Sequence, residues 1–538
     1  MSKPNDTTIH GWREVICLFV VIGLVSSIRL PSLWYQKGSQ DEQWFTVPGW
    51  TVACEGVPRI PYAPVEQNPA SVFEGAHRTL YALPPAYFYL QAVFFLLLPA
   101  GYGTARLASW VSGSGLLILL YVLMRQLRIR PAIALLSVFV CAFSRAFYFP
   151  WQDSRPDMLC AMFGVAAINC IVRAIQCDSR KMAAMAGVFT GLGALSHPYA
   201  LVFAIQIGIL QLWSNLPVRT RILNCAVSGL TTLAAMTLWV PLILVDANSF
   251  WSQFSKNVLS RSGPGILSRL LWPWPSVSHH ARLVYERAGA LQTGVIAAVL
   301  SIAVLLVVQR MWKVRKRSKN DDTNGALVGT ATMLLLSAVY LHLASVGMHP
   351  AKGYLCYPWA MVMLFVAALV DRFGFDTSAK EVSQRRLKFV VAVFVMLFAA
   401  CLPGSGLRAA WTFATRNDDA NYNRQQFCRN LNERFPPDAR LLVSPEFVFE
   451  FELLGRRPVN ASLMKMYQDV EGIPFDYLIS STQCLDEGVA ESLHCELVWT
   501  DGDPNDPLAC YAEVYVPGLD TLVSREWPRT LRSTGKGP

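Results

Sequence analysis

Long apolar runs recur along the whole chain and constrain its fold more than any other feature. A helix needs roughly 17–25 residues to cross the hydrocarbon core of a bilayer, and about eleven runs approach this length. They cover residues 15–34, 105–124, 131–149, 156–176, 182–196, 198–214, 222–245, 291–310, 326–347, 354–371 and 388–406. Because 53% of the residues are hydrophobic and only 16% are charged, the composition excludes an ordinary soluble fold. We predict an α-helical polytopic membrane protein with about eleven transmembrane helices.

Lys and Arg gather in alternate loops between these runs, which predicts an orientation. The clusters lie at 125–130, 173–181, 219–221, 313–319 and 372–388. Positive residues in short loops mark the cytoplasmic side, so we expect the N-terminus inside and the C-terminus outside. The short basic loops and the lack of a sorting signal favour a bacterial inner membrane with a periplasmic outer face.

A further apolar run at 84–99 would break this alternation if it crossed the membrane. We therefore predict that it forms an interfacial or re-entrant helix within a large outer loop at 35–104. The aromatic residues at its start, such as Tyr87 and Tyr89, suit the headgroup layer of a bilayer.

Composition divides the chain into residues 1–411, a predicted transmembrane catalytic domain, and residues 412–538, a predicted exterior soluble α/β domain. The second part holds 12 Lys and Arg against 20 Asp and Glu, a net charge of −8, which leaves +18 for the first part. Segments 439–444, 476–480 and 512–516 are typical of short strands, and 419–434 is typical of a helix. Basic loops beside membrane spans bind anionic lipid, so no nucleic-acid partner is needed to explain the charge.

Ionisable residues gather where the predicted spans reach the outer face. Four outer loops supply them: Asp41, Glu42, Asp153, Arg155, Asp157, His197, Lys352 and Tyr354. Ionisable groups in membrane proteins cost free energy and mark functional sites. The sequence therefore predicts a site at the outer surface and not at the middle of the membrane.

Transfer of a sugar from a polyprenyl-phosphate donor suits these residues. The phosphate is a good leaving group, so the demanding step is removal of the acceptor hydroxyl's proton during attack on the anomeric carbon. A carboxylate can act as that base, as in inverting sugar chemistry. Cations near the phosphate stabilise the developing charge. Arg155, Lys352 and Arg78 are candidates for this role, with Tyr354 as a hydrogen-bond donor.

Several short motifs carry a family resemblance. They are Asp41-Glu42-Gln43-Trp44-Phe45, Pro84-Pro85-Ala86-Tyr87-Phe88-Tyr89-Leu90-Gln91-Ala92, Ala105-Arg106-Leu107, Ser154-Arg155-Pro156-Asp157-Met158-Leu159, Gly193-Ala194-Leu195-Ser196-His197-Pro198-Tyr199 and Lys352-Gly353-Tyr354-Leu355-Cys356-Tyr357-Pro358. In their order and spacing, the chain resembles the GT-C integral-membrane glycosyltransferases, relatives of protein O-mannosyltransferases and lipid A aminoarabinose transferases.

The resemblance implies an inverting enzyme in which Asp41 is the general base, with Asp157 as the second acidic site; Glu42 is a candidate supporting acid. It implies a polyprenyl-phosphate-linked sugar donor, whereas the acceptor remains open between a lipid, a glycan and a protein. Asp41 and Asp157 are also candidates to hold a divalent metal ion, although the sequence shows no complete set of ligands.

The candidate substrate-binding residues come from four loops: Arg155, Lys352, Tyr354, His197 and Arg78. Arg78 is included because this chain has Tyr81-Ala82-Leu83 where many relatives carry a Lys just before the Pro-Pro pair.

These residues also have purely structural interpretations. The Asp41-Glu42 pair and Asp157 suit helix N-termini, and Lys352 suits an anchor at the headgroups. Asp153 is predicted to be an exposed loop residue. The alternative function is that of a transporter or lipid flippase, which typically shows repeated halves and polar groups at mid-depth. A scaffold whose exterior domain binds a partner would not explain the acidic residues at one face.

Overall fold

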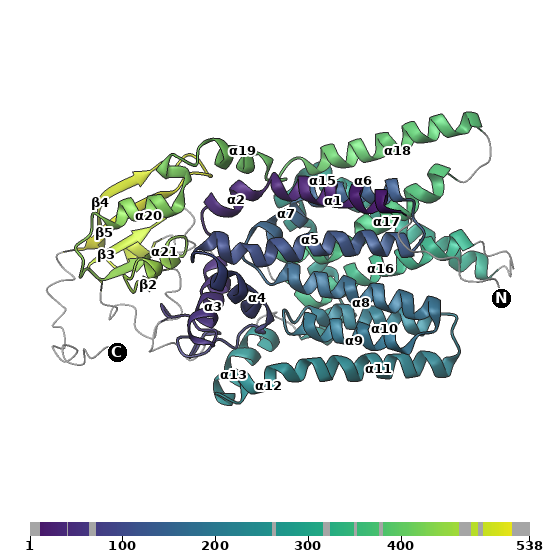
Figure 1. Cartoon of the computed structure of the whole chain (residues 1–538), viewed down its shortest axis with the longest axis horizontal. Coiled ribbons are helices and arrows are strands. Elements are labelled where there is room, and N and C mark those ends of the chain that lie inside the picture. Colours follow the sequence, from purple (N-terminus) through teal and green to yellow (C-terminus); the bar gives the residue numbers. More distant parts are fainter. Residues whose placement is uncertain are drawn as a thin grey trace.

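The computed structural model describes residues 11–39, 41–63, 71–260, 265–315, 323–348, 352–375, 380–461, 475–481 and 488–518. It has two parts, a bundle of long helices and a smaller domain with a β-sheet at one end of the bundle (Figure 1). The fold class predicted from the sequence is thereby confirmed.

Each apolar run predicted as a span lies on a helix. The bundle helices are α1 (Trp12–Ser27), α5 (Tyr102–Gln126), α6 (Pro131–Phe143), α7 (Arg145–Gln152), α8 (Asp157–Cys177), α9 (Arg180–Ala194), α10 (Ala200–Trp213), α11 (Val218–Met236), α15 (Trp274–Arg315), α16 (Thr323–Val346), α17 (Cys356–Phe375) and α18 (Lys380–Cys401). Six helices among the described residues are long and apolar enough to cross a membrane, and the bent pair α6–α7 makes a seventh. The remaining runs form α1, α9, α10 and α18, whose apolar stretches are shorter, so length alone supports six or seven of the eleven predicted spans.

The bend between α6 and α7 carries the chain into the outer loop that holds the candidate site. The two helices meet at 64°. At the junction Ser144 has extended backbone, and its hydroxyl accepts a hydrogen bond from the Phe147 N–H as the N-cap of α7. Capping by a Ser oxygen satisfies a backbone donor that the new helix leaves unpaired. The bend therefore has a local cause in the sequence.

The first outer loop folds into three short helices, α2 (Leu30–Tyr35), α3 (Glu42–Glu55) and α4 (Ala86–Leu97). With 12 residues, α4 is too short to cross the hydrocarbon core, in agreement with the interfacial or re-entrant helix predicted at 84–99. A Cβ atom at Gly49 of α3 would lie 2.5 Å from Oε1 of Gln91 of α4, so these helices pack closely only because residue 49 is glycine. Gln91 in turn donates to Ser154 Oγ at 2.6 Å. This contact connects the first loop to the loop after α7.

The middle outer loop contains η1 (Thr237–Trp239), α12 (Val240–Ile243), α13 (Ala247–Phe254), η2 (Ser255–Ser260) and α14 (Ile266–Leu271). The buried side chain of Gln253 on α13 docks it onto the first loop. Its Oε1 accepts from the N–H groups of Tyr81 and Ala82 at 2.7 and 3.0 Å, and its Nε2 donates to the carbonyls of Glu74 and Thr79 at 2.8 and 3.0 Å.

The exterior domain is a small α/β unit. Its helices are α19 (Leu407–Thr415), η4 (Ala420–Tyr422), α20 (Arg424–Asn432), α21 (Val448–Leu453) and α22 (Val489–Ser492). Its strands are β1 (Leu441–Val443), β2 (Val459–Asn460), β3 (Tyr477–Ser480), β4 (Cys495–Gly502) and β5 (Tyr511–Pro517), in the order β2-β1-β3-β5-β4. β1 is parallel to β2 and β3, whereas β5 is antiparallel to β3 and β4. The three predicted strands correspond to β1, β3 and β5, and α19 spans the predicted domain boundary at 411.

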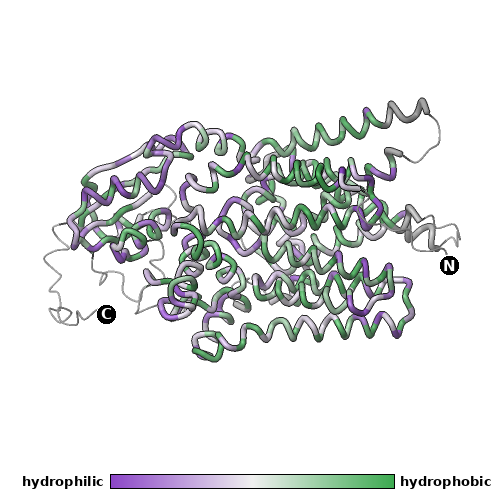
Figure 2. Tube along the Cα trace, in the orientation of Figure 1, coloured by the Kyte–Doolittle hydropathy of each residue, from purple (hydrophilic) through white to green (hydrophobic). Residues whose placement is uncertain are grey.

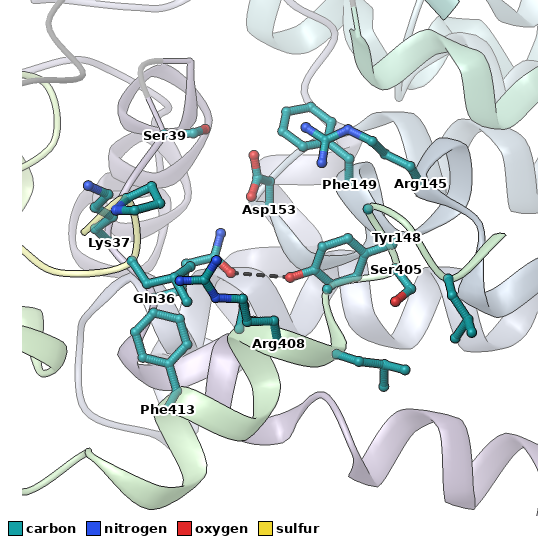
Figure 3. Close-up of a pocket in the computed structure, with 17 residues that line it drawn as sticks. Gln36, Lys37, Ser39, Arg145, Tyr148, Phe149, Asp153, Ser405, Arg408 and Phe413 are labelled. Atoms are coloured by element: carbon teal, nitrogen blue, oxygen red, sulfur yellow. Dashed lines mark hydrogen bonds between the residues drawn. The ribbon is translucent and has the colours of Figure 1, made fainter. Parts of the chain in front are cut away.

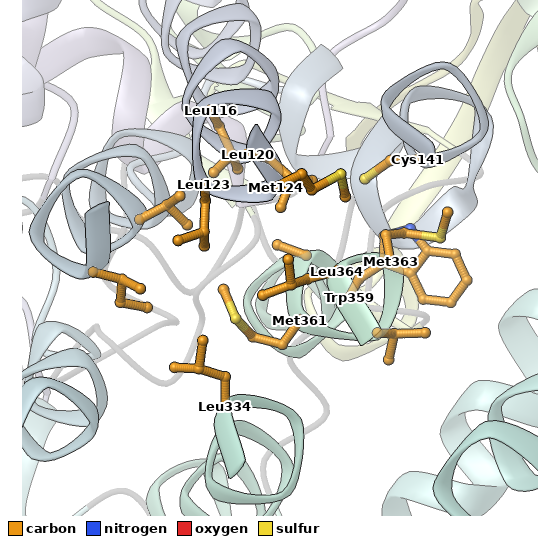
Figure 4. Close-up of a cluster of buried hydrophobic side chains, with 14 of the residues drawn as sticks. Leu116, Leu120, Leu123, Met124, Cys141, Leu334, Trp359, Met361, Met363 and Leu364 are labelled. Atoms are coloured by element: carbon orange, nitrogen blue, oxygen red, sulfur yellow. The ribbon is translucent and has the colours of Figure 1, made fainter. Parts of the chain in front are cut away.

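The core of the bundle lies between α5, α6, α16 and α17. Close-packed apolar side chains fill it (Figure 4): Leu116, Leu120, Leu123, Met124, Cys141, Leu334, Trp359, Met361, Met363 and Leu364. The outer helices also carry exposed apolar residues, including Leu230 and Leu233 of α11. Hydrophilic residues concentrate instead in the exterior domain and the first loop (Figure 2). This distribution suits a bundle surrounded by lipid with a solvated domain at one end.

Arg424 at the start of α20 fixes the exterior domain to the bundle. Its Nε donates to Glu450 Oε1 at 2.9 Å, and its Nη1 donates to the carbonyl of Gln36. The guanidinium also lies over the ring of Tyr102 on α5, 4.2 Å from the ring centroid. The domain is therefore held directly above the first loop.

Candidate active site

Arg155 brings two of the predicted carboxylates together at the outer end of the bundle. Its Nη1 lies 2.8 Å from Asp41 Oδ2, and its Nε lies 2.8 Å from Asp157 Oδ2. The Asp41 side chain is 60% exposed, whereas Asp157 is completely buried. The accessible member of this Asp41–Arg155–Asp157 group is thus the predicted base.

Neighbouring elements hold each member of the group in place. Asp41 immediately precedes α3, and Asp157 is the first residue of α8. The Ser109 hydroxyl of α5 accepts from the Arg155 N–H at 3.0 Å and donates to the Arg155 carbonyl at 2.9 Å. The position of the arginine is therefore set by its backbone as well as by its ion pairs. Burial lowers the pKa of Arg155, but Asp157 and Asp41 outweigh it and raise the pKa, so the arginine stays charged.

Glu42 has a different environment from Asp41 although the two are adjacent. It is fully buried and forms a two-bond ion pair with Arg106 of α5, with distances of 2.6 and 2.8 Å. It also accepts from the backbone N–H groups of Ser154 at 2.9 Å and Ser39 at 3.1 Å. Burial acts to raise the pKa of Glu42, but the ion pair with Arg106 and these hydrogen bonds outweigh it and lower the pKa. Glu42 therefore fixes the loops around the site and does not face the open side.

His197 and Tyr354 border the Asp41–Arg155–Asp157 group from two further loops. The rings of His197 and Tyr354 meet edge to face with centroids 5.1 Å apart. A Cβ atom at Gly353 would lie 2.7 Å from Arg155 Nε, so this loop reaches the guanidinium because residue 353 is glycine. Tyr357 donates to Asp157 Oδ1 at 3.4 Å. Burial lowers the pKa of His197 to about 4, so it is a neutral group near pH 7.

The two remaining cationic candidates are Lys352 and Arg78. Lys352 begins η3 (Lys352–Leu355), directly beside Gly353, but its side chain lies outside the described residues. Arg78 is 67% exposed, and its Nη2 lies 4.0 Å from Asp246 at the start of α13. The described contacts thus place Arg78 at the docked middle loop and not beside Arg155.

The prediction of Asp153 as an exposed loop residue was wrong. Its side chain is only 2% exposed because α7 turns it beneath the first loop and the exterior domain. Burial, together with the negative charge of Glu42, raises its pKa to about 7. It borders a cavity of about 530 Å³ between the bundle and the exterior domain (Figure 3). The sequence placed Asp153 among the ionisable residues of the outer loops but gave no sign of its burial.

The carboxylates do not form the metal site suggested by the sequence. The Arg155 guanidinium lies between Asp41 and Asp157, so an ion bridging these two would have to displace it. Within the described ranges there is also no group of three or more His, Cys, Asp or Glu side chains arranged to hold an ion. We derive no step through a metal.

Comparisons with known proteins agree with this architecture. Residues 82–257 match the family model of dolichyl-phosphate-mannose-protein mannosyltransferases. The fold is similar to that of ArnT from Cupriavidus metallidurans bound to undecaprenyl phosphate, with 12% identity, coverage of 95% of this chain and 99% of that chain, and a TM-score of 0.53. It is also similar to the apo oligosaccharyltransferase from Archaeoglobus fulgidus, with 12% identity, coverage of 96% and 75%, and a TM-score of 0.51. No curated protein sequence matches the chain significantly.

The chain thus has a membrane fold of the GT-C glycosyltransferase type, and residues 82–257 carry the match to a mannosyltransferase family. These matches confirm the resemblance that the short motifs predict.

Proposed function

We propose that this enzyme transfers a sugar from a polyprenyl-phosphate donor to an acceptor, with inversion, at the periplasmic face of a bacterial inner membrane. The N-terminus would lie in the cytoplasm and the exterior domain in the periplasm. The observation that carries the proposal is the Asp41–Arg155–Asp157 group, in which one exposed carboxylate is held beside a buried cation. A similar fold that binds undecaprenyl phosphate supports the class of donor.

Asp41 is the proposed general base. It takes the proton of the acceptor hydroxyl as the oxygen forms a bond to the anomeric carbon. The bond between this carbon and the phosphate oxygen breaks from the opposite side, and polyprenyl phosphate leaves with the electron pair. A base contributes by removing the proton as the new bond forms, and attack opposite the leaving group inverts the anomeric configuration.

The leaving phosphate requires positive charge and hydrogen-bond donors. We assign this role to Arg155, Lys352 and Tyr354, since η3 packs over the guanidinium of Arg155. His197 contributes a neutral polar surface beside Tyr354, and Arg78 lies farther out at the docked middle loop. Asp157 orients Arg155, and Glu42 has a positioning role because it is enclosed. The acceptor can be a lipid, a glycan or a protein.

The test uses full-length protein in lipid nanodiscs with radiolabelled polyprenyl-phosphate sugars and crude membrane acceptors. Asp41→Asn should reduce the release of polyprenyl phosphate by at least about 100-fold, as expected for loss of a general base, while donor binding persists. Asp418→Asn is the matched control, because Asp418 is an exposed residue of the exterior domain. Turnover of Asp41→Asn at the rate of this control would refute Asp41 as the base. Failure of every donor to bind the wild type would refute the proposed donor class.

A further inference from the structure

The outer-loop helix α4 has one exposed face and one buried face. Tyr89 and Leu96 are 43% and 70% exposed, whereas the polar side chains of Tyr87 and Gln91 are fully buried. Residues four positions apart lie on the same face of a helix, so Tyr87 and Gln91 point together into the protein. Burying a polar side chain costs free energy unless it is hydrogen-bonded. The bonds of these two side chains therefore indicate what the buried face of α4 does.

Tyr87 is hydrogen-bonded to the side chain that holds the backbone of Arg155. The hydroxyl oxygens of Tyr87 and Ser109 lie 2.7 Å apart. Ser109 donates its one proton to the Arg155 carbonyl at 2.9 Å and accepts from the Arg155 N–H at 3.0 Å. Because a hydroxyl group has one donor and two acceptor sites, Tyr87 is the donor in its bond to Ser109. Burial raises the pKa of Tyr87, so its hydroxyl keeps the proton that this bond requires.

Gln91 holds the neighbouring residue, Ser154. Its Nε2 donates to Ser154 Oγ at 2.6 Å and to the Ala105 carbonyl of α5 at 3.3 Å. The Tyr87 hydroxyl oxygen also lies 3.4 Å from Ser154 Oγ. Buried hydrogen bonds thus join α4 to α5 and to Ser154, so α4 fixes the backbone from which the Arg155 side chain extends.

The Arg155 side chain has little freedom to compensate for a displaced backbone. It is 5% exposed, and its Nη1 and Nε each lie 2.8 Å from a carboxylate oxygen, of Asp41 and Asp157 respectively. A Cβ atom at Gly353 would lie 2.7 Å from its Nε, so the loop that carries Gly353 closes another side. A misplacement of about 1 Å in an active site can cost about 100-fold in rate. The position of this backbone therefore matters for the whole Asp41–Arg155–Asp157 group.

We propose that Tyr87 is a positioning residue of the candidate active site. Through Ser109 it holds the backbone of Arg155, so that the guanidinium stays between Asp41 and Asp157 and can contact the phosphate of the donor. The contact with phosphate rests on the proposed function. The hold on the Arg155 backbone does not depend on it, so the two can be tested separately.

The first experiment measures hydrogen–deuterium exchange of the Arg155 amide in full-length protein in nanodiscs, with no ligand added. Tyr87→Phe leaves an acceptor site of Ser109 unpaired and loosens the bonds to Arg155, so this amide should exchange at least about 10-fold faster. Tyr89→Phe is the matched control, because it removes an exposed hydroxyl group from the same helix. Equal exchange of the Arg155 amide in these two variants would overturn the proposal.

The second experiment measures the Kd of undecaprenyl phosphate at equilibrium. Tyr87→Phe should weaken binding about 10-fold, the contribution of one charge-assisted hydrogen bond. In the Arg155→Gln background the same substitution should change Kd by less than about 2-fold, because no guanidinium is left to position. An equal effect in both backgrounds would indicate a general structural role and overturn the proposal. If Arg155→Gln binds no undecaprenyl phosphate, the exchange of the Arg155 amide decides alone.

A second pair of variants covers the case in which Tyr87→Phe does not fold. Ser109→Ala removes the same hold from α5 and should also accelerate exchange of the Arg155 amide. Ser112→Ala is its control, because this buried hydroxyl of α5 donates to the Ala108 carbonyl of its own helix at 2.6 Å. Equal exchange in Ser109→Ala and Ser112→Ala would overturn the proposal as well. A wild type that binds no undecaprenyl phosphate would count against the proposed function, whereas faster exchange in Tyr87→Phe would still establish the hold on Arg155.

Discussion

At the scale of residues, three acidic side chains within one site have three environments. Asp41 is exposed and paired with Arg155, Glu42 is enclosed with Arg106, and Asp153 is enclosed beside a cavity. Chemical role follows from these surroundings and not from residue type, since burial and neighbouring charges decide protonation and access.

The first prediction compares two glutamates of α3. Glu42→Gln should lower the free energy of unfolding by about 3–5 kcal/mol, because it leaves Arg106 buried without its partner. Glu55→Gln should cost less than about 1 kcal/mol, because the Glu55–Arg59 pair is partly exposed. Chemical denaturation in detergent measures both. If Glu42→Gln unfolds like the wild type but has no activity, Glu42 is a catalytic acid after all.

The second prediction concerns the pH dependence of stability. The pKa of Asp153 is about 7 in the folded protein, whereas its ordinary value is 3.8. Between pH 3.8 and about pH 7, Asp153 therefore holds a proton in the folded protein that it has released in the unfolded chain. Stability should therefore fall as pH rises from about 4 to about 7. Asp153→Asn removes this effect. The difference in the free energy of unfolding between Asp153→Asn and the wild type should therefore be up to about 4 kcal/mol more favourable to the variant at pH 8 than at pH 4.

Thermal unfolding across pH 4–8 measures this difference. Glu42, whose pKa is lowered from its ordinary value of 4.5, adds stability as pH rises through the acidic end of this window, but it does so in the wild type and in Asp153→Asn alike. Arg106 and Arg155 stay charged throughout. Asp418→Asn is the control for charge removal at an exposed site and should follow the wild type. A parallel pH profile for Asp153→Asn and the wild type would contradict a raised pKa at Asp153.

At the scale of elements, short helices and turns position the site, and the long helices support them. The bend after α6 aims residues 153–157 at the first loop, and α3 places Asp41 and Glu42 on different sides of its first turn. The helix α13 then holds the first loop through the buried Gln253 amide and through Ser252, which donates to Glu74. Such an element can control how well the first loop is ordered without contacting the reacting atoms.

The third prediction tests this clamp. Gln253→Leu removes four hydrogen bonds to the first loop and leaves buried backbone groups without partners. The amides of Tyr81 and Ala82 should then exchange with solvent at least about 10-fold faster, as measured by hydrogen–deuterium exchange. Gln426→Leu on the exposed side of α20 is the control. Unchanged protection at these two amides would show that α13 does not hold the loop.

At the scale of the whole molecule, the exterior domain packs on the bundle beside the candidate site and is not an independent appendage. Arg424 joins it to α5 and to the residues after α2, and residues 507–508 close the cavity beside Asp153. Two clusters of buried residues span the interface, so that the domain packs against α3 and α4 as a core would. This arrangement gives the exterior domain a position next to the candidate site that its sequence does not indicate.

The sequence by itself indicated the apolar helices, three strands of the exterior sheet and the loop ends at which Asp41, Arg155 and Asp157 lie. These depend on local information, since an apolar run folds as a helix in lipid wherever it lies and short motifs mark loop ends. Only the tertiary structure decided which carboxylates are accessible. Glu42 and Asp153 are buried because α5, the bent α7 and the exterior domain cover them, and segments far apart in the sequence provide that cover. Burial and pairing are non-local quantities, so a pattern of neighbouring residues cannot specify them.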